Sequence, residues 1–526
     1  MSSRGFVLRW TVVLGFAAVL AASAQGNDRR GAWGPVFDWG LPERLTTPIH
    51  ASVVVTRPGG QGPLVGQVFT HGYYGTTWSY LWNPETGVFT LIDFFPDDSA
   101  RECGDGRPDA MTSLFCSGHC VLADGQLLLA GGDLMHEDQN CPLGYAFAGA
   151  YYSHTINPLD PSPTYVRAGD MNQGRWYPTN TMLGDGSVVT FSGLTECASC
   201  DDNGFPISPL NTDVERYNPA TRTWSIISQR ALPLYPWMHL LSNGRVFYAG
   251  PGRDSHRFNP NNGTWSFVDF FDHPYRSYGT SVLYPAGPDQ VLVIGGACCG
   301  DFATNTTEII DLSLSSPQWR PGPAMRTGRT QLNAVLLPDG SVLAVGGRSD
   351  FDFGGPQAQP VYRAERLDPF ARRQRWKRMA SMSRPRMYHS TAVLLPDGRV
   401  LSAGGTVAEG YPLDEKNAQI FSPPYLFKGA RPVITSAPEE VTYGASFSVV
   451  TAEADQISSV VLIRPSSVTH AFNMEQRYVP VTFASRGGSL EVWAPSGGNV
   501  APPGYYMLFI LNRDRVPSTA AFIRLH

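Results

Sequence analysis

The chain repeats one short pattern of polar and apolar residues along most of its length. Each copy has an Asp-Gly or Asn-Gly turn, or a relative of it, then a run of aliphatic and β-branched residues, and then one or two glycines. Such a turn between apolar runs is a strong β-hairpin signal, because glycine tolerates the positive φ of a tight turn. Each copy therefore predicts two adjacent antiparallel strands. Six copies are visible, at residues 124–132, 185–193, 243–250, 289–296, 339–347 and 397–405.

A second pattern lies between these copies. An apolar or aromatic residue is followed by Asn-Pro or Asp-Pro and then by a tryptophan, as in residues 217–224, 258–265 and 367–376. Together the two patterns give a period of about 45 to 60 residues with four short strands, which is the size of a kelch-like β-propeller blade. A degenerate copy within residues 51–84 raises the predicted number of blades to seven.

The repeat stops near residue 425, and long runs with helical periodicity are absent throughout. From residue 431 onward, short alternating strands are predicted at residues 446–450, 459–463, 477–482, 490–493 and 505–512. We therefore predict an all-β protein with two domains. A seven-bladed kelch-like β-propeller occupies residues 25–425, and an immunoglobulin-like β-sandwich occupies residues 426–526.

Residues 1–24 have the pattern of a secretory signal peptide. Arg4 and Arg9 flank the start of an apolar run over residues 10–21, and Ala-Ser-Ala at residues 22–24 is a small-residue cleavage pattern. The run is too short to span a membrane. We expect a secreted, extracellular protein that begins at Gln25 and has no membrane partner.

Composition excludes another class of partner. Of the 40 Lys and Arg residues, two lie in the leader, so 38 basic residues face 45 acidic ones and the net charge of the mature chain is −7. A chain with this negative net charge is not expected to bind polyanions, so nucleic acid is excluded as a partner. The 42% hydrophobic content, with 54 glycines and 43 prolines, is typical of a large, turn-dense globular protein with an ample core. We expect a monomer.

Three motifs occupy the same place relative to a hairpin turn. Cys116, Tyr177 and Tyr388 each precede an Asp-Gly turn by eight or nine residues, and equal offsets in a propeller mean equal height around its central channel. His389 follows Tyr388 directly, so the pair can share a metal only if it lies outside a regular strand. A phenol oxygen and an imidazole nitrogen together suit Cu(II). His470, in a predicted loop of the second domain, would have to reach the same channel.

Simpler roles exist for each of these residues. A buried Tyr-His pair is usually structural, and His470 could cap a loop. Cys116 could form a disulfide with Cys120 or Cys103, since secreted proteins normally pair their cysteines. What favours a site over these separate roles is that all the motifs occur together and in order.

Two further pairs of cysteines have a structural interpretation. Cys298 and Cys299 are adjacent and predict either a vicinal disulfide or separate partners. Cys197 and Cys200 have zinc half-site spacing, but no second pair of fitting spacing follows. We expect a local disulfide there.

At this point the chain resembles the galactose oxidase and glyoxal oxidase group, the copper radical oxidases, over essentially its whole mature length. The family motifs Phe-Cys-Ser/Pro-Gly, Arg-x-Tyr-His-Ser and Thr-His are met by residues 115–118, 386–390 and 469–470. The crosslink tyrosine of the family falls on Tyr177. Its local sequence, Arg-Trp-Tyr-Pro at residues 175–178, is closer to glyoxal oxidase than to galactose oxidase.

The resemblance implies one copper ion bound by Tyr177, Tyr388, His389 and His470, and a covalent thioether between the Cys116 sulfur and the Tyr177 ring. This protein-derived radical cofactor and the copper would each hold one oxidising equivalent, so no organic cofactor is needed. Tyr388 would accept the substrate proton as general base, and Tyr177 would abstract hydrogen from the substrate carbon. O2 would reoxidise the site and leave as H2O2, which makes peroxidases candidate partners.

The sequence departs from galactose oxidase in two places. That enzyme stacks a tryptophan on the crosslinked ring, whereas residues 192–197 here contain none, and no sugar-binding module precedes the propeller. These departures favour a small aldehyde, glyoxal-like and hydrated to a geminal diol, or a simple primary alcohol. The alternative is a non-enzymatic kelch-type propeller that binds carbohydrate or protein. Cys116 and Tyr177 separate the two hypotheses, because a binding module has no need for that pair.

Overall fold

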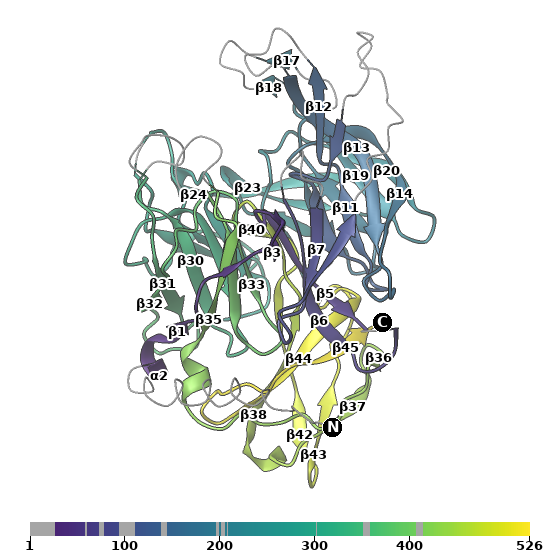
Figure 1. Cartoon of the computed structure of the whole chain (residues 1–526). Helices are drawn as coiled ribbons and strands as arrows, with labels where there is room; N and C mark the ends of the chain where they lie inside the picture. The colour runs from purple at the N-terminus through teal and green to yellow at the C-terminus, as the bar shows by residue number, and fades with distance from the viewer. Residues whose placement is uncertain are drawn as a thin grey trace, which may run out of the picture.

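Strands make up nearly all the regular structure of this protein. The computed structural model describes residues 27–57, 60–72, 78–93, 111–137, 145–195, 199–200, 206–207, 209–300, 302–350, 358–406 and 414–526. Within them, the helical elements are α2 (Asn27–Arg30) and the 3₁₀ turns η2 (Pro424–Phe427) and η3 (Ala454–Gln456). The predicted all-β class is confirmed (Figure 1). The predicted leader lies outside the described residues, and among those described no helix combines the length and apolarity needed to cross a bilayer.

Seven sheets of the described chain contain an antiparallel path of four strands. Their first strands, here called the inner strands, are β5 (His50–Thr56), β10 (Gly118–Val121), β15 (Thr179–Met182), β21 (Met238–Leu240), β25 (Thr280–Leu283), β29 (Thr330–Leu336) and β33 (Ser390–Leu394). The second strands are β6 (Val65–His71), β11 (Leu127–Ala130), β16 (Val188–Phe191), β22 (Val246–Tyr248), β26 (Gln290–Ile294), β30 (Val342–Arg348) and β34 (Val400–Gly404).

The outer half of each sheet follows in chain order, with one exception. The third strands are β7 (Trp78–Trp82), β13 (Tyr145–Ile156), β19 (Asp213–Asn218), β23 (Gly252–Asn259), β27 (Thr307–Asp311), β31 (Arg363–Leu367) and β35 (Asn417–Ser422). The fourth are β8 (Phe89–Asp93), β14 (Tyr165–Arg175), β20 (Thr223–Gln229), β24 (Thr264–Tyr275), β28 (Arg320–Pro321) and β32 (Trp376–Ser381). The last sheet instead takes β1 (Ala32–Trp33) and β2 (Phe37–Asp38) from the other end of the chain.

Six short strands remain in the described part of residues 27–425. β9 (Met111–Ser113) and β12 (Asp133–Glu137) belong to the sheet of β10, whereas β3 (Gly40–Leu41) with β4 (Arg44–Leu45) and β17 (Ser199–Cys200) with β18 (Pro206–Ile207) form two separate two-stranded sheets.

The predicted Asp-Gly turns join inner to second strands. In the β29–β30 turn, Gly340 has a φ of 74° and the Asp339 side chain accepts a hydrogen bond from the Ser341 backbone N–H at 3.1 Å. An Asp side chain that bonds the backbone two residues ahead fixes the turn locally. The same bond recurs from Gln126 to Asp124, Ser187 to Asp185, Arg245 to Asn243 and Arg399 to Asp397.

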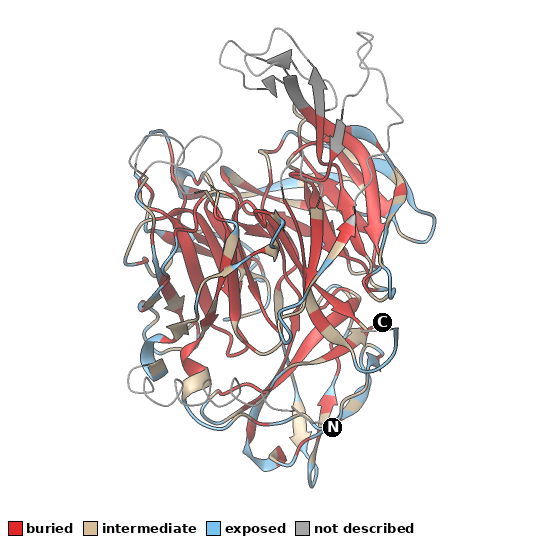
Figure 2. Cartoon of the chain, viewed as in Figure 1, coloured by how far each residue is buried: buried red, intermediate tan, exposed pale blue. Residues whose placement is uncertain are grey.

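The inner strands contact one another in a closed series. Strands β5, β10, β15 and β21 contact in that order, as do β25, β29 and β33, and β33 contacts β5 again. The His239 Nε2 and Ser281 hydroxyl form a 2.7 Å hydrogen bond that joins β21 to β25. Every residue of β5, β29, β30 and β33 is buried, so these strands pack on both faces (Figure 2).

The C-terminal part forms two further sheets, with strands at all five predicted places. One has the order β36 (Glu440–Val441), β45 (Ala521–Leu525), β44 (Gly504–Asn512), β38 (Ile457–Arg464) and β41 (Arg477–Val481). The other has the order β37 (Ser446–Val450), β43 (Ser489–Trp493) and β42 (Phe483–Ser485). Val449, Leu462, Leu490 and Leu508 belong to one buried cluster, which packs the two sheets together.

One hairpin leaves this C-terminal part and joins an inner strand. Strands β39 (Ser467–Thr469) and β40 (Phe472–Asn473) form the hairpin, and β39 pairs antiparallel with β5. The hairpin also contacts β10, β25, β29 and β33, so it lies within the series of inner strands. Figure 1 shows β40, in the yellow-green of the C-terminal region, among the purple and green strands.

Candidate metal centre

Within the described residues, six non-glycine residues with positive φ stand at the entries to six inner strands. They are Cys116, Tyr177, Tyr235, Tyr278, Gln331 and His389, with φ of 58°, 67°, 45°, 43°, 58° and 65°. This conformation is uncommon and costs energy outside glycine, so it persists only where the surrounding structure imposes it. Cys116, Tyr177 and His389, all predicted from the sequence, are among the six.

Backbone hydrogen bonds tie neighbouring entries together. The Tyr177 N–H donates to the Cys116 carbonyl at 3.0 Å, and the Tyr235 N–H donates to the Tyr177 carbonyl at 2.9 Å. On the other side, the Gln331 N–H donates to the Tyr278 carbonyl at 2.7 Å. Five of the six strand entries are therefore bonded to a neighbouring entry. Tyr388 and His389 precede β33 rather than lying in it, as shared coordination of a metal requires.

A buried arginine fixes the segment before each of several entries. Arg175 is wholly buried and donates to the Ser192 carbonyl at 2.7 Å and to the Glu215 carboxylate at 2.8 Å. Glu215 lies on the third strand of the sheet that Tyr177 opens. The arrangement recurs in Arg276 with Glu308, Arg329 with Glu365 and Arg386 with Asn417. Arg175, Arg276 and Arg386 each stand two positions before a tyrosine, and Arg329 stands two positions before Gln331, so these bonds fix the backbone just before the strand entries.

His470 lies at the turn of the β39–β40 hairpin, in agreement with the predicted loop position. The Thr469 hydroxyl donates to the Ile49 carbonyl at 3.1 Å and forms a 2.7 Å hydrogen bond with His470 Nδ1. The Thr469 hydroxyl has a single proton, which it donates to the Ile49 carbonyl. Its oxygen must therefore accept the other hydrogen bond from His470 Nδ1–H. This assigns the tautomer and leaves the His470 Nε2 lone pair free to bind a metal.

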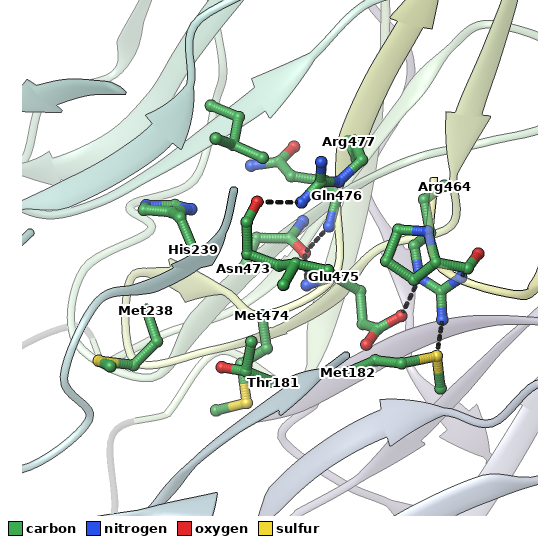
Figure 3. A pocket seen from close by; sticks show the side chains of 13 residues that line it. Thr181, Met182, Met238, His239, Arg464, Asn473, Met474, Glu475, Gln476 and Arg477 are labelled. Atoms are coloured by element: carbon green, nitrogen blue, oxygen red, sulfur yellow. Dashed lines mark hydrogen bonds and ion pairs between the residues drawn. The ribbon is translucent and has the colours of Figure 1, made fainter. Parts of the chain in front are cut away.

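A polar anchor holds this hairpin in place. The Arg464 guanidinium pairs with the Glu475 carboxylate and donates to the Val121 carbonyl at 2.8 Å. Gln476 Nε2 donates to the Ala334 carbonyl at 2.8 Å, and Arg477 donates to the Leu240 carbonyl. These groups surround a cavity of about 30 Å³, and the labelled side chains converge on it in Figure 3. The segment after His470 is thereby bonded to residues at three different sheets.

The structure brings all five predicted residues into one cluster. Cys116 Sγ lies 3.5 Å from His470 Nε2, and the Tyr177 and Tyr388 hydroxyl oxygens are 2.9 Å apart. One ligand atom each from Cys116, His389 and His470 lies within 4.8 Å of the others. The Tyr177 and Tyr388 ring centroids lie 4.9 and 5.4 Å from that of His470.

Burial keeps every one of these groups neutral. It lowers the pKa of His389 to about 3 and the pKa of His470 well below its usual value. It raises the pKa of the Cys116 thiol and of the Tyr177 and Tyr388 phenols well above their usual values. A cation would reverse the shifts of the phenols, because it favours their charged forms. Two neutral imidazoles and two phenols are the N,O donor set that Cu(II) prefers, so these residues fit a copper ion.

Three tyrosines of the site are less deeply buried than its other residues. Cys116, His389 and His470 are buried, whereas Tyr177, Tyr278 and Tyr388 are each half-buried.

Sequence reasoning missed two tyrosines of the site. Tyr235 has its ring centroid 4.8 Å from that of His470, and Tyr278 lies 5.2 Å from Tyr388. Tyr278 shares the Arg-x-Tyr spacing of Tyr177 and Tyr388, and this spacing could have found it. Trp176 packs edge-on against Tyr177, with ring centroids 4.7 Å apart.

The cysteines separate into two kinds. Cys116 and Cys120 are buried thiols without a disulfide, so they are not paired with each other. Cys298 and Cys299 form a vicinal disulfide, one of the two predicted possibilities. Cys103 and Cys197 lie outside the described residues. The Cys197–Cys200 disulfide therefore stays a prediction.

Family models match most of the chain. The glyoxal oxidase N-terminus model covers residues 107–425, and the galactose oxidase-like early set domain model covers residues 431–525. The aldehyde oxidase GLOX of Vitis pseudoreticulata is 30% identical, over 79% of this chain and 82% of that protein. The galactose oxidase of Gibberella zeae is 27% identical, over 94% of this chain and 70% of that protein.

A solved structure shares the fold. It is a fungal alcohol oxidase of the AA5 family in complex with copper, 24% identical, with a TM-score of 0.75 over 94% of this chain and 100% of that one. The matched models, the relatives and the clustered ligand set agree. The chain belongs to the glyoxal oxidase and galactose oxidase family of copper radical oxidases.

Proposed function

We propose that the protein oxidises a small aldehyde, as its hydrate, or a simple primary alcohol, with O2 as the electron acceptor and H2O2 as the second product. The observation that carries this proposal is the convergence of Cys116, Tyr177, Tyr388, His389 and His470 from distant parts of the chain. The names of the relatives, an aldehyde oxidase and a galactose oxidase, favour these two substrate classes.

Each residue has a role that follows from its place. His389, His470, Tyr177 and Tyr388 hold the copper ion, which supplies Lewis-acid polarisation and one oxidising equivalent when bound. The second equivalent resides on Tyr177 once its ring is bonded to the Cys116 sulfur, because the sulfur makes the ring easier to oxidise. Tyr388 accepts the hydroxyl proton of the substrate, and Tyr177 takes a hydrogen atom from the substrate carbon. The substrate loses two hydrogens in total, which balances the reduction of O2 to H2O2.

The proposal includes the architecture. The seven four-stranded sheets are the blades of a kelch-like propeller over residues 25–425, and the closed series of inner-strand contacts supports this arrangement. The two C-terminal sheets form an immunoglobulin-like sandwich over residues 426–526. Residues 1–24 are a secretory leader, and the enzyme acts outside the cell as a monomer.

Peptide mass mapping tests the cofactor. After copper loading in air and full reduction, the Cys116 and Tyr177 peptides should stay joined, with a combined mass two hydrogens below their sum. Cys116→Ser is the matched control and should give separate peptides. Separate peptides from the parent protein would overturn the oxidase and leave a propeller that binds carbohydrate or protein.

A substrate panel then assigns the class. Small aldehydes and primary alcohols should release H2O2 in the presence of the copper-loaded protein and O2, whereas galactose should release much less. Strong peroxide release with galactose alone would overturn the small-substrate assignment.

A further inference from the structure

A cluster of three buried histidines lies directly behind the metal centre and has no part in ligand binding. His50 opens strand β5, where its backbone pairs with Thr469 on one side and with His71 on the other. His71 and His119 complete the cluster, and all three are at most 3% exposed. Thr469 directly precedes His470, so the backbone of His50 is joined to the strand that carries a proposed copper ligand.

The side chain of His50 reaches a second component of the site. Its Nε2 accepts a hydrogen bond from the Cys116 backbone N–H at 2.9 Å. Burial lowers the pKa of His50 well below its usual value, so the ring is neutral and Nε2 can accept. His50 therefore joins His470, through the sheet, to Cys116, through its ring.

Packing fixes the orientation of this imidazole. The rings of His50 and His71 stack with centroids 3.9 Å apart and an interplanar angle of 12°. The ring of His119 packs edge-on against that of His50, with centroids 5.2 Å apart and an interplanar angle of 68°. His119 Nδ1 forms hydrogen bonds with the Ser52 and Ser467 hydroxyls, each at 2.9 Å. The His50 ring is therefore contacted on one face by His71 and edge-on by His119, which fixes its orientation.

A second metal site does not explain the cluster. Imidazole lone pairs lie in the ring plane, and the stacked planes of His50 and His71 are nearly parallel, so their lone pairs do not converge on one point. Among the described residues, the metal-capable group of His, Cys, Asp or Glu side chains is Cys116, His389 and His470. The cluster instead acts on the geometry of its neighbour.

Cys116 is the residue whose geometry needs support. Its φ of 58° lies in the left-handed region, which is unfavourable for a cysteine. Its side chain is wholly buried, and its sulfur must face the Tyr177 ring for a bond to form between them. An acceptor placed on the Cys116 N–H favours this backbone conformation over relaxed ones, in which the buried amide would lose its partner.

We propose that His50 is a positioning residue that holds the Cys116 sulfur against the Tyr177 ring before the thioether forms. This inference rests on the proposed function. In the step concerned, the S–H bond of Cys116 and one ring C–H bond of Tyr177 break and a C–S bond forms. The two electrons and two protons pass to O2, which is reduced to H2O2.

Three variants test the role. His50→Phe keeps an aromatic ring for stacking but removes the acceptor, and His50→Gln restores an acceptor near the Nε2 position. His71→Phe is the matched control, because it alters the stack without touching the bond to Cys116. Each variant is purified free of copper and then exposed to copper and air, and the two-hydrogen mass loss is followed over time.

The expected result is a slower crosslink in one variant only. His50→Phe should form the thioether about tenfold more slowly, the ratio that corresponds to loss of one buried hydrogen bond. His50→Gln and His71→Phe should stay close to the parent rate. Hydrogen exchange of the copper-free protein supplies an independent readout, since the Cys116 amide should exchange about tenfold faster in His50→Phe alone.

The outcomes separate this inference from the proposed function. If the parent forms the thioether and His50→Phe forms it at the same rate, the positioning role is overturned and the oxidase assignment stands. If His71→Phe is slowed as much as His50→Phe, the cluster has a general structural role and the inference is also overturned. If the parent forms no thioether, the proposed function itself fails.

Discussion

The hydroxyl oxygens of Tyr177 and Tyr388 lie 2.9 Å apart, although 211 positions separate the two residues in the sequence. Burial is the largest cause of the raised pKa of both phenols, and the neighbouring Cys116 and Tyr278 raise both further, whereas the hydrogen bond from Tyr177 partly lowers the pKa of Tyr388. Two phenolates at this distance would repel strongly, so a pair without a cation keeps its protons. The proposed role of Tyr388 as proton acceptor therefore depends on a cation that favours the charged form of a phenol.

Tyr388→Phe should retain copper and lose most turnover. The change removes the oxygen that would bind copper and accept the proton, while His389, His470 and Tyr177 remain. Loss of a general base costs about 100-fold to 10,000-fold in rate. Copper content by elemental analysis and H2O2 release measure the two effects. Peroxide release equal to that of the parent would remove Tyr388 from the role of base.

Thr469→Val should weaken copper binding about 10-fold to 100-fold, because the Thr469 oxygen fixes the tautomer and orientation of His470. Thr469→Ser keeps the hydroxyl and is the matched control. Competition with a chelator of known affinity measures the dissociation constants. Equal affinities in the valine and serine variants would show that the hydroxyl does not orient the ligand.

His239→Gln should make the copper-free protein less sensitive to acid. Burial lowers the pKa of His239 from 6.5 to about 3, so the folded protein keeps this ring neutral while the unfolded chain protonates it. The unfolded state then binds the extra proton, so stability is complete above the unfolded pKa and falls as the pH drops towards the folded one. From pH 7 to about pH 4.5 the loss attributable to His239 is about 3 kcal/mol.

Denaturant unfolding at the two pH values measures this effect. His239→Gln should show a smaller fall in the free energy of unfolding than the parent, by about 3 kcal/mol. The exposed His526 offers a control. In His526→Gln the free energy of unfolding should decrease with pH by the same amount as in the parent. If the free energy of unfolding of His239→Gln decreases as much as that of the parent, the buried neutral His239 is not a source of the acid sensitivity.

Glu215→Ala should destabilise the protein by about 3 to 5 kcal/mol, because it leaves the buried Arg175 without its counter-charge. Asp170→Ala removes the partner of Arg167 in a partly exposed pair and should cost at most about 1 kcal/mol. Thermal and denaturant unfolding compare the two. Similar losses would show that the buried pair is not what holds the segment before Tyr177.

Local patterns predicted the strands and the position of the site well. The Asp-Gly turns located the hairpins, because the turn chemistry at residues such as Asp339 and Gly340 is decided within a few positions. The alternation of side chains along a strand required Tyr388 and His389 to lie outside one if they share a metal, and both precede β33. These features are determined by residues close together in the chain, so a single sequence is enough to predict them.

Long-range pairing could not be predicted in this way. His50 sits in an apolar run without a motif, and its contact with Cys116 appears only when two sheets are packed together. The pairing of Ser467 with Ser52 joins residues more than 400 positions apart. Such contacts are chosen by packing, and the strand pattern of either segment permits many partners.

The β39–β40 hairpin has a consequence for the making of the protein. His470 follows Cys116 by 354 positions in the chain, so it is synthesised after Cys116. The earlier sheets can assemble during synthesis, but their centre lacks a ligand until the C-terminal hairpin inserts beside β5. A chain that stops before β39 would therefore lack both His470 and the strand that pairs with β5.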